Sequence, residues 1–165
     1  LKDSNNLYAE SMYYQLAAAT GSRPATAKHA REAERVLLRK VGLNPANYRL
    51  ADGSGLSLYN YLSAEAEVKL LRYAYQNENI FYHLYQALPI AGVDGTLKKR
   101  MRSTFTRNNV RAKTGTLTGI SSLAGYCKAA NGHWLSFAII NQGVMHARNA
   151  KNFQNRVCTI LCAPN

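Results

Sequence analysis

The sequence contains no long hydrophobic run and has few charged residues for its length. Its apolar stretches are short, such as residues 137–140, whereas a membrane-spanning helix needs about 18 apolar residues in a row. Of the 165 residues, 47% are hydrophobic and 18% are charged, a composition that argues against intrinsic disorder. A chain of this length fits one domain and buries a core without disulfides or metals. Residues 1–11 lack the basic start and the apolar core of a signal peptide.

Acidic residues are missing from the second part of the chain. Asp94 is the last carboxylate, and residues 95–165 hold 11 Lys and Arg, so most of the net charge of +12 lies there. This charge favours an anionic partner, for which nucleic acid, an acidic cell-wall polymer and a small carboxylate ligand all qualify. A solvated basic surface is the alternative. Nucleic acid fits least, because no RNP, helix-turn-helix or zinc-finger pattern is present and ten of the eleven Tyr precede residue 95.

The three cysteines, Cys127, Cys158 and Cys162, form no CxxC pair, and the four histidines form no HExxH motif. Metal sites need such clustered ligands, so we predict no catalytic metal and no cofactor. Cys158 and Cys162 share one face if their segment is helical, and thiols in such positions are typically buried as small apolar side chains. A disulfide that involves Cys127 remains open, because it depends on the redox compartment.

Residues 1–107 predict mainly helix. Asp3 or Ser4 fits the N-cap of a first helix that ends near residues 16–19, and Ser63 fits the N-cap of a later one. The other predicted helices cover residues 26–41, 64–77 and 80–88. In the helix at 26–41, the positions expected to face inward are Ala30, Ala33, Leu37 and Val41. The positions expected to form a solvated stripe are Arg31, Arg35 and Arg39.

The pattern changes after residue 108, where short β-rich stretches alternate with glycines. Residues 109–141 predict three consecutive antiparallel strands, and the Ala130-Asn131-Gly132 step is a strong hairpin signal. Residues 147–161 return to helix, with apolar residues at four-residue spacing, namely Phe153, Val157 and Leu161. Helices, then a β-meander, then a closing helix predict the α+β class.

The sharpest chemical signal is Lys113-Thr114-Gly115-Thr116 on the first predicted strand. Desolvating an ammonium inside a sheet is costly, so Lys113 fits a strand edge beside a cleft, where it supplies a fixed positive charge. Gly115 leaves room for a ligand against the strand, and the hydroxyls of Thr114, Thr116 and Thr118 suit a carboxylate. For the KTG triplet alone, an exposed lysine on an edge strand is an equal alternative.

A weaker motif is Ser4-Asn5-Asn6, at the start of the first predicted helix, where a Ser is most often only an N-cap. SxN followed by KTG matches two motifs of the set SxxK, S-[DN]-N and KTG. The blocks KDSNNLYAE, LADGSGLS, LPIAGVDGTL, VRAKTGTL and SSLAGY extend the match. The sequence thereby resembles the penicillin-binding D-alanyl-D-alanine carboxypeptidases and endopeptidases of the dacB type, peptidase family S13, from Lys2 to about Asn141.

The third motif, SxxK, is absent, because no lysine has a serine three residues before it. In the family this nucleophile and its base precede SxN. We therefore expect residues 1–165 to be the C-terminal part of one transpeptidase-like (β-lactamase-like) domain, with a helical part at 1–107 and a β-meander plus closing helix at 108–165. The missing N-terminal part is then a partner, and residues 1–165 alone are expected to be inactive. A natural relative without a nucleophile is the alternative.

The resemblance implies acyl transfer. The SxxK serine of the complete enzyme attacks the bond between the last two D-alanines of a peptidoglycan stem peptide, and β-lactam antibiotics mimic that substrate. In this scheme Ser4 relays a proton, Asn6 bonds to the substrate or holds the missing lysine, and Lys113 supplies positive charge. The remaining candidates form the substrate-binding strand: Thr114, Gly115, Thr116 and Thr118. The backbone N–H of Thr116 would be half of an oxyanion hole.

Other classes remain open. A class A β-lactamase shares the motifs, but no ExxLN-type segment with a deacylating Glu lies between SxN and KTG. A non-catalytic wall-binding relative would use its basic residues on an anionic polymer, among them Lys98, Lys99, Arg100 and Arg102. A nucleic-acid-binding module rests on charge alone. The resemblance further implies a bacterial periplasm or cell envelope, and an exposed apolar face through which this piece could form a homodimer.

Overall fold

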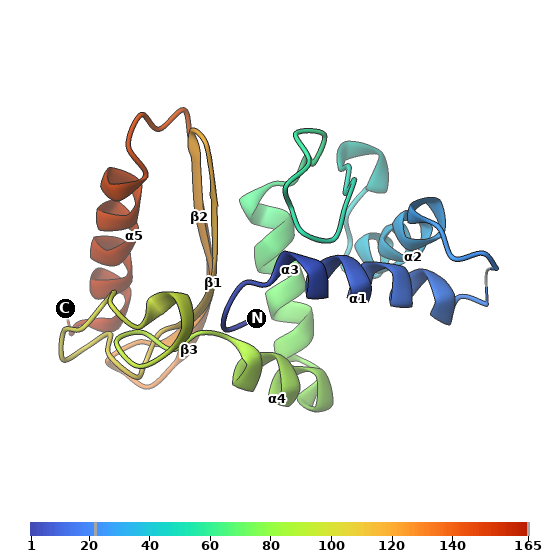
Figure 1. Cartoon of the computed structure of the whole chain (residues 1–165). Coiled ribbons are helices and arrows are strands. Elements are labelled where there is room, and N and C mark those ends of the chain that lie inside the picture. Colours follow the sequence, from blue (N-terminus) through green and yellow to red (C-terminus); the bar gives the residue numbers. More distant parts are fainter. Residues whose placement is uncertain (22, 165) are drawn as a thin grey trace. The chain divides into compact units, whose positions relative to one another are not determined.

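Residues 1–21 and 23–164 are described by the computed structural model, and within them the chain forms five α-helices, two short 3-10 helices and one three-stranded sheet (Figure 1). Four α-helices precede the sheet and one follows it, which confirms the predicted α+β class. The chain divides into two compact units, one of residues 5–66 and one of residues 1–4 with 67–165. In the part of the chain that is described, no helix has the length and apolar character to cross a membrane.

The unit of residues 5–66 is helical. It contains α1 (Asn6–Ala19), α2 (Ala27–Lys40), the 3-10 helix η1 (Pro45–Asn47) and the first turn of α3 (Ala64–Tyr75). The sequence predicted a helix for each of α1, α2 and α3. The observed ends of these helices differ from the predicted ends by about two residues at most.

The N-caps follow the expected chemistry, but not always at the expected residue. Asn5 caps α1 by accepting the Tyr8 N–H, so the predicted cap at Asp3 or Ser4 is wrong. An N-cap residue needs extended backbone, which Asn5 has, whereas Ser4 has a φ of +52°. Ser63 does cap α3 as predicted, because its hydroxyl accepts the Ala66 N–H at 3.2 Å.

Two small apolar clusters hold this unit together, and α2 contributes to both. Ala30 packs with Tyr13 and Ala17 of α1, whereas Leu38 packs with Leu43 and Ala66. Ala30 therefore faces inward as predicted, but the inward position near the end of α2 is Leu38, and the predicted Leu37 is exposed. The buried face shifts along α2 because its two halves pack against different neighbours.

The unit of residues 1–4 and 67–165 is built around the sheet. Its strands are β1 (Arg111–Leu117), β2 (Ile120–Lys128) and β3 (Trp134–Gln142). They pair antiparallel in the order β1-β2-β3, which confirms the predicted meander. The turn between β2 and β3 closes where the Ala129 N–H donates to the His133 carbonyl, and Gly132 has the positive φ of +82° that this hairpin requires.

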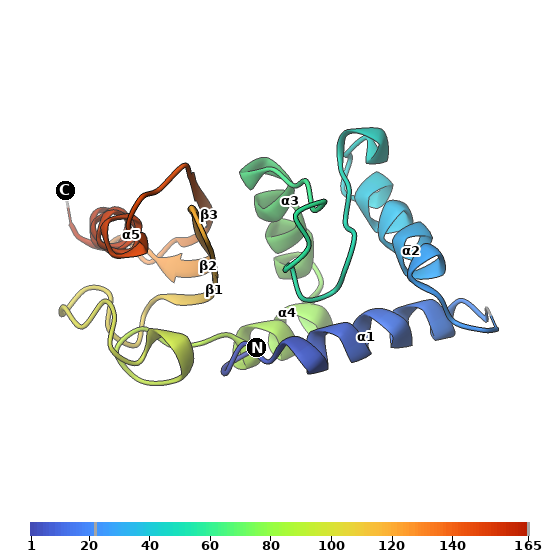
Figure 2. The same cartoon turned by 45° about the horizontal axis from the view of Figure 1, so that its top comes forward.

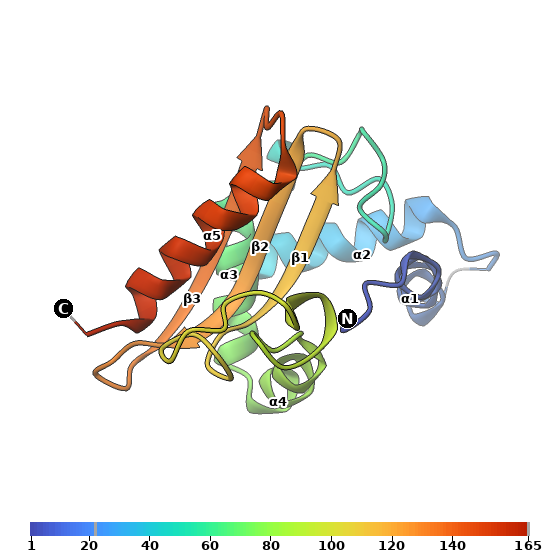
Figure 3. The ribbon, with the colours of Figure 1, turned by 60° about the vertical axis from the view of Figure 1, so that its left-hand side comes forward.

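Helices cover both faces of the sheet. The closing helix α5 (Ala147–Cys162) lies against one face, as Figures 2 and 3 show. On the other face, the Tyr126 hydroxyl donates to the Leu71 carbonyl of α3 at 2.7 Å. Phe81, from α4 (Glu78–Ala87), packs edge-on against Tyr126 and Trp134.

The buried stripe of α5 includes the two cysteines that were expected to share one buried face. Its buried residues are Ala150, Gln154, Cys158 and Cys162, whereas Phe153 is exposed. Gln154 is buried because its amide donates to Ser121 and Asn141 and its oxygen accepts from Arg100. Apolar periodicity gives no weight to a buried glutamine, so the burial of Gln154 was not expected from the sequence. Arg100 donates to Gln154 and Asn155 and so serves the interior, whereas the wall-binding alternative would place it against an anionic polymer.

The three cysteines are buried in one core cluster between the sheet and α5, as expected for Cys158 and Cys162, and all three are free thiols. Cys127 lies on β2, and Cys158 and Cys162 lie one turn apart on α5. Burial raises the pKa of the Cys158 thiol to about 12. These side chains thus serve as small apolar core residues in this structure.

Candidate active site

The KTG segment lies on β1, which is an edge strand of the sheet. In an edge strand, alternate residues direct their N–H and C=O groups away from the sheet. The Ala112 N–H donates outward to the Pro89 carbonyl at 3.1 Å. Thr114 and Thr116 have the same orientation as Ala112, so their backbone N–H groups also face this edge. The Thr116 N–H is therefore directed away from β2, as an oxyanion-hole donor would need to be.

Lys113 brings the two motifs together. Its Nζ donates to Ser4 Oγ at 2.7 Å and to the Thr114 carbonyl at 2.6 Å. Ser4 and Lys113 are 109 positions apart in sequence, so only the fold makes them neighbours. Burial lowers the pKa of the Lys113 ammonium. A desolvated ammonium beside a serine hydroxyl is an arrangement that can supply charge to a reaction and orient a proton relay.

Ser4 adopts an unusual backbone conformation. Its φ of +52° lies in the left-handed region, which residues other than glycine rarely occupy. The Ser4 N–H donates to the Leu1 carbonyl, so residues 1–4 form a tight turn. Strained residues of this kind persist where the surrounding structure holds them, and they concentrate at functional sites.

The threonines and Gly115 lie in different surroundings. Thr114 Oγ1 donates to Thr96 Oγ1 at 2.9 Å, a partner that the sequence reading did not identify. Thr116 is exposed on β1, and Thr118 is exposed in the turn that follows. Because side chains alternate along a strand, Lys113 and Gly115 share one face, and Thr114 and Thr116 share the other. A Cβ at Gly115 would collide with Ser122 Oγ, so the glycine also serves strand packing.

Asn6 is the first residue of α1 and is exposed. It belongs to the unit of residues 5–66, whereas Ser4 and Lys113 belong to the other unit. The structure thus brings together Ser4, Lys113 and Thr114, and Asn6 follows Ser4 by two positions in the sequence.

Two loops contain aspartates that stabilise turns. Asp52 accepts the N–H groups of Gly55 and Ser57 and the Asn60 side-chain amide. Asp94 accepts the Ile90 N–H. Asp94 also forms an ion pair with Lys2, which sequence reasoning missed because the two residues are 92 positions apart. Within the described residues, no group of three His, Cys, Asp or Glu side chains is placed to hold a metal ion.

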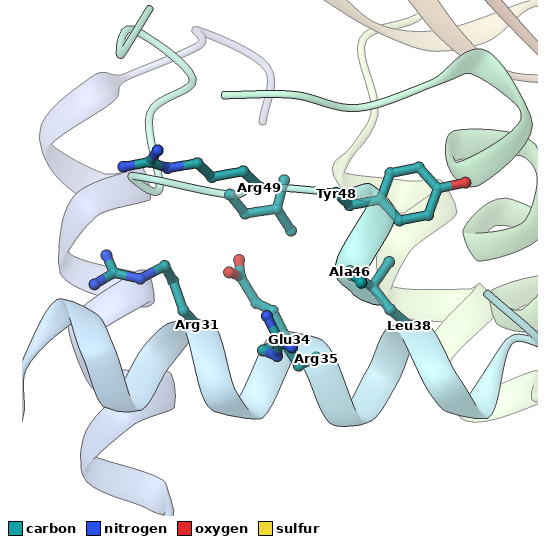
Figure 4. A pocket seen from close by; sticks show the side chains of 8 residues that line it. Arg31, Glu34, Arg35, Leu38, Ala46, Tyr48 and Arg49 are labelled. Carbon is teal, nitrogen blue, oxygen red and sulfur yellow. The ribbon is translucent and has the colours of Figure 1, made fainter. Parts of the chain in front are cut away.

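A separate cavity of about 470 Å³ lies in the unit of residues 5–66, between α2 and residues 46–50 (Figure 4). Arg31 and Arg35 line it, so only Arg39 of the predicted solvated stripe lies outside it. The Glu34 carboxylate points into this space, and its Oε2 is buried without a hydrogen-bond partner among the described residues. Burial raises the pKa of Glu34 from 4.5 to about 7, although Arg31 opposes the shift.

We expect Glu34→Gln to reduce the pH dependence of stability between pH 5 and pH 8. The folded state binds the Glu34 proton more tightly than the unfolded chain does. The stability that this bound proton contributes is therefore lost as the pH rises from about 4.5 to about 7. The effect on the free energy of unfolding should be on the order of 1 kcal/mol, since partial exposure screens the charge. Urea unfolding at several pH values measures it. The exposed Glu32→Gln is the control, and equal pH profiles for both variants would contradict the assignment.

The fold is shared with penicillin-interacting proteins. Over 99% of its length, the chain is similar to penicillin binding protein 4 (dacB) from Haemophilus influenzae complexed with a β-lactam, with a TM-score of 0.89 and 32% identity, covering 40% of that chain. TLA-3 extended-spectrum β-lactamase matches 78% of the chain with a TM-score of 0.59 and 18% identity, covering 52% of that chain, which shows the fold alone. The fold is that of penicillin-binding proteins and β-lactamases.

The sequence comparisons are more specific. Residues 1–163 match the D-Ala-D-Ala carboxypeptidase 3 (S13) family. D-alanyl-D-alanine carboxypeptidase DacB of Haemophilus influenzae is 38% identical over 139 residues, 83% of this chain and 29% of that protein. D-alanyl-D-alanine carboxypeptidase of an Actinomadura species is 38% identical over 152 residues, 87% of this chain and 27% of that protein. The chain therefore belongs to the S13 family, as its motifs predicted, and it spans less than a third of the length of these relatives.

Proposed function

We propose that these residues belong to a serine-type D-Ala-D-Ala carboxypeptidase that hydrolyses peptidoglycan stem peptides and is acylated by β-lactams. The observation that carries this proposal is the 2.7 Å hydrogen bond from Lys113 Nζ to Ser4 Oγ, which joins the SxN and KTG motifs. Membership of the S13 family supports the substrate class. Such an enzyme would act where peptidoglycan lies, in the bacterial periplasm or cell envelope.

Each candidate residue has a role that its chemistry fits. Ser4 passes a proton toward the leaving amine, since a hydroxyl both donates and accepts, and the Lys113 charge stabilises that transfer. Asn6 donates an amide hydrogen bond to the substrate. Thr114 and Thr118 offer hydroxyls to the substrate carboxylate. The outward Thr116 N–H stabilises the developing oxyanion, and Gly115 keeps the strand close to its neighbour.

The nucleophile itself lies outside these residues, because they contain no SxxK motif. In this proposal, residues 1–165 are the C-terminal part of one transpeptidase-like domain, and the remaining part of the same protein supplies the serine and its base. Exposed apolar side chains on α1 support such a partner, since Leu7, Tyr8 and Met12 are each 70% exposed. Surfaces of this kind mark contact sites.

The test is to incubate the complete gene product and, separately, residues 1–165 with penicillin and to read intact masses. We expect one covalent adduct on the complete protein, and none on residues 1–165 or on the heat-denatured complete protein. If the complete protein gains no adduct, a non-catalytic wall-binding relative becomes the better description. An adduct on residues 1–165 would instead make Ser4 the nucleophile.

A further inference from the structure

The turn that carries Ser4 is attached to a distant loop, and both lie in the unit of residues 1–4 and 67–165. The attachment has a side-chain part and a backbone part. Lys2 Nζ contacts Asp94 Oδ2 at 2.6 Å, and the Thr96 N–H donates to the Lys2 carbonyl at 3.2 Å. Gly95 permits this close approach, because a Cβ there would lie 2.6 Å from the Lys2 carbonyl oxygen.

Asp94 is held in position for this contact. Its Oδ1 accepts the Ile90 N–H at 2.8 Å, so one oxygen closes the loop while the other pairs with Lys2. Burial raises the pKa of the Asp94 carboxyl, but the contacts with Lys2 and the Ile90 N–H outweigh burial and lower it overall. The carboxylate is thus charged at neutral pH, and the ion pair is formed under the conditions of the proposed reaction.

The same loop is attached to the strand that carries Lys113. The Ala91 N–H donates to the Val110 carbonyl at 2.9 Å, and the Pro89 carbonyl accepts from Ala112 at 3.1 Å. Farther along, Thr96 Oγ1 accepts from Thr114 Oγ1 at 2.9 Å. Residues 89–96 therefore contact β1 on both sides of Lys113 in the sequence and contact Lys2 as well.

This arrangement explains how the Ser4 conformation is maintained. A left-handed φ at a residue other than glycine costs of order 1–3 kcal/mol and persists only where neighbouring contacts impose it. Ser4 is two residues from Lys2, and its hydroxyl meets Lys113 at 2.7 Å. Without the attachment at Lys2, the hydrogen bonds left to residues 1–4 among the described residues would be the Lys113 bond and the turn from Ser4 to Leu1.

We propose that the Lys2–Asp94 ion pair is a positioning device that sets Ser4 against Lys113. This inference rests on the proposed function. In it, Lys2 and Asp94 do not touch the reacting atoms and act only through Ser4. Errors of about 1 Å in the placement of a reacting group can lower a rate by about 100-fold. An exposed ion pair contributes only about 0–1 kcal/mol to stability. The pair should therefore affect the rate far more than it affects folding.

The experiment compares Lys2→Met, Lys2→Arg and wild type in the complete protein, with Asp3→Asn as a control that removes a neighbouring charge from the same turn. Asp3 is exposed and lies in the same turn. For Lys2→Met we expect a 10- to 100-fold lower first-order rate constant of acylation by penicillin, with unchanged non-covalent affinity and a melting temperature within about 3 °C. Lys2→Arg should recover most of that rate, and Asp3→Asn should retain it. Acylation of Lys2→Met at the wild-type rate would overturn the proposal.

A second readout does not depend on activity. Titration of the Lys113 side chain by NMR should give a higher pKa in Asp94→Asn than in wild type, because a loosened Ser4 turn admits water to the ammonium, whereas loss of a nearby negative charge alone would lower that pKa. An unchanged Lys113 titration would overturn the positioning role. If wild type is not acylated at all, the proposed function fails, and this titration still decides whether the Lys2–Asp94 ion pair positions Ser4.

Discussion

Replacing Lys113 with Met is expected to lower the second-order rate constant for acylation of the complete protein by penicillin about 100- to 1000-fold. Lys113 Nζ donates to Ser4 Oγ at 2.7 Å and to the Thr114 carbonyl at 2.6 Å. A methionine side chain has similar length and flexibility, but it has neither the charge nor the donors. The Ser4 hydroxyl would lose the partner that orients it, and the developing negative charge would lose its nearby cation. Quenched labelling with a fluorescent penicillin measures the rate.

Two controls separate this effect from a loss of folding. Lys99→Met removes an exposed lysine from the same unit and should leave the rate unchanged. Burial already lowers the pKa of Lys113, which means that the folded protein disfavours its charge. Lys113→Met should therefore melt at the wild-type temperature or above it. If Lys113→Met is acylated as fast as Lys99→Met, Lys113 has no part in the reaction.

Gly125→Ala is expected to destabilise the protein by about 3 kcal/mol, at the upper end of the usual effect of overpacking. Gly125 pairs with Ala112 across β1 and β2. A Cβ at position 125 would collide with the Arg111 carbonyl oxygen and lie 2.6 Å from the Ala112 Cα. These are backbone atoms of the paired strand, so relief requires β1 to move, and β1 carries Lys113. Urea unfolding gives the change in the free energy of unfolding.

Gly115→Ala is the matched comparison in the same pair of strands. Its new Cβ would meet only Ser122 Oγ closely, and the next atom, Ser122 Cβ, is 3.7 Å away. A serine hydroxyl can rotate to another rotamer, so the loss should stay below about 1 kcal/mol. The double variant Gly115→Ala with Ser122→Ala should remove most of that loss. Equal destabilisation by Gly115→Ala and Gly125→Ala would show that backbone crowding at Gly125 is not the cause.

The β part of the fold was predictable because its signals are local. The Asn131-Gly132 step and the β-rich stretches bounded by glycines indicate where strands end and which neighbours they pair with. The three strands and their order were correct for this reason. Helix faces were less predictable, because neighbouring apolar residues fit the same period almost equally well. Leu37 was preferred over the buried Leu38, and the burial of Gln154 was not foreseen.

For the candidate site, the residue types were accessible from sequence and their connections were not. Family motifs indicated that Ser4 and Lys113 should be close, and the structure places them in hydrogen-bond contact. Nothing local indicated that Thr114 meets Thr96, or that Asp94 pairs with Lys2. Such contacts depend on which loops the tertiary fold brings together. Sequence patterns do not predict these contacts, because each partner alone is an ordinary polar residue of a kind common on protein surfaces.

The chain leaves one unit after residue 4 and returns to it at residue 67, so residues 5–66 form an insertion within that unit. The entropy of closing a loop grows only with the logarithm of its length, at roughly 0.6 kcal/mol for each doubling. Lengthening or shortening this insertion would therefore change the closure free energy of the Ser4 turn very little. Such proteins can alter a whole helical segment between SxN and KTG while the energetic demand on the Ser4–Lys113 contact stays nearly constant.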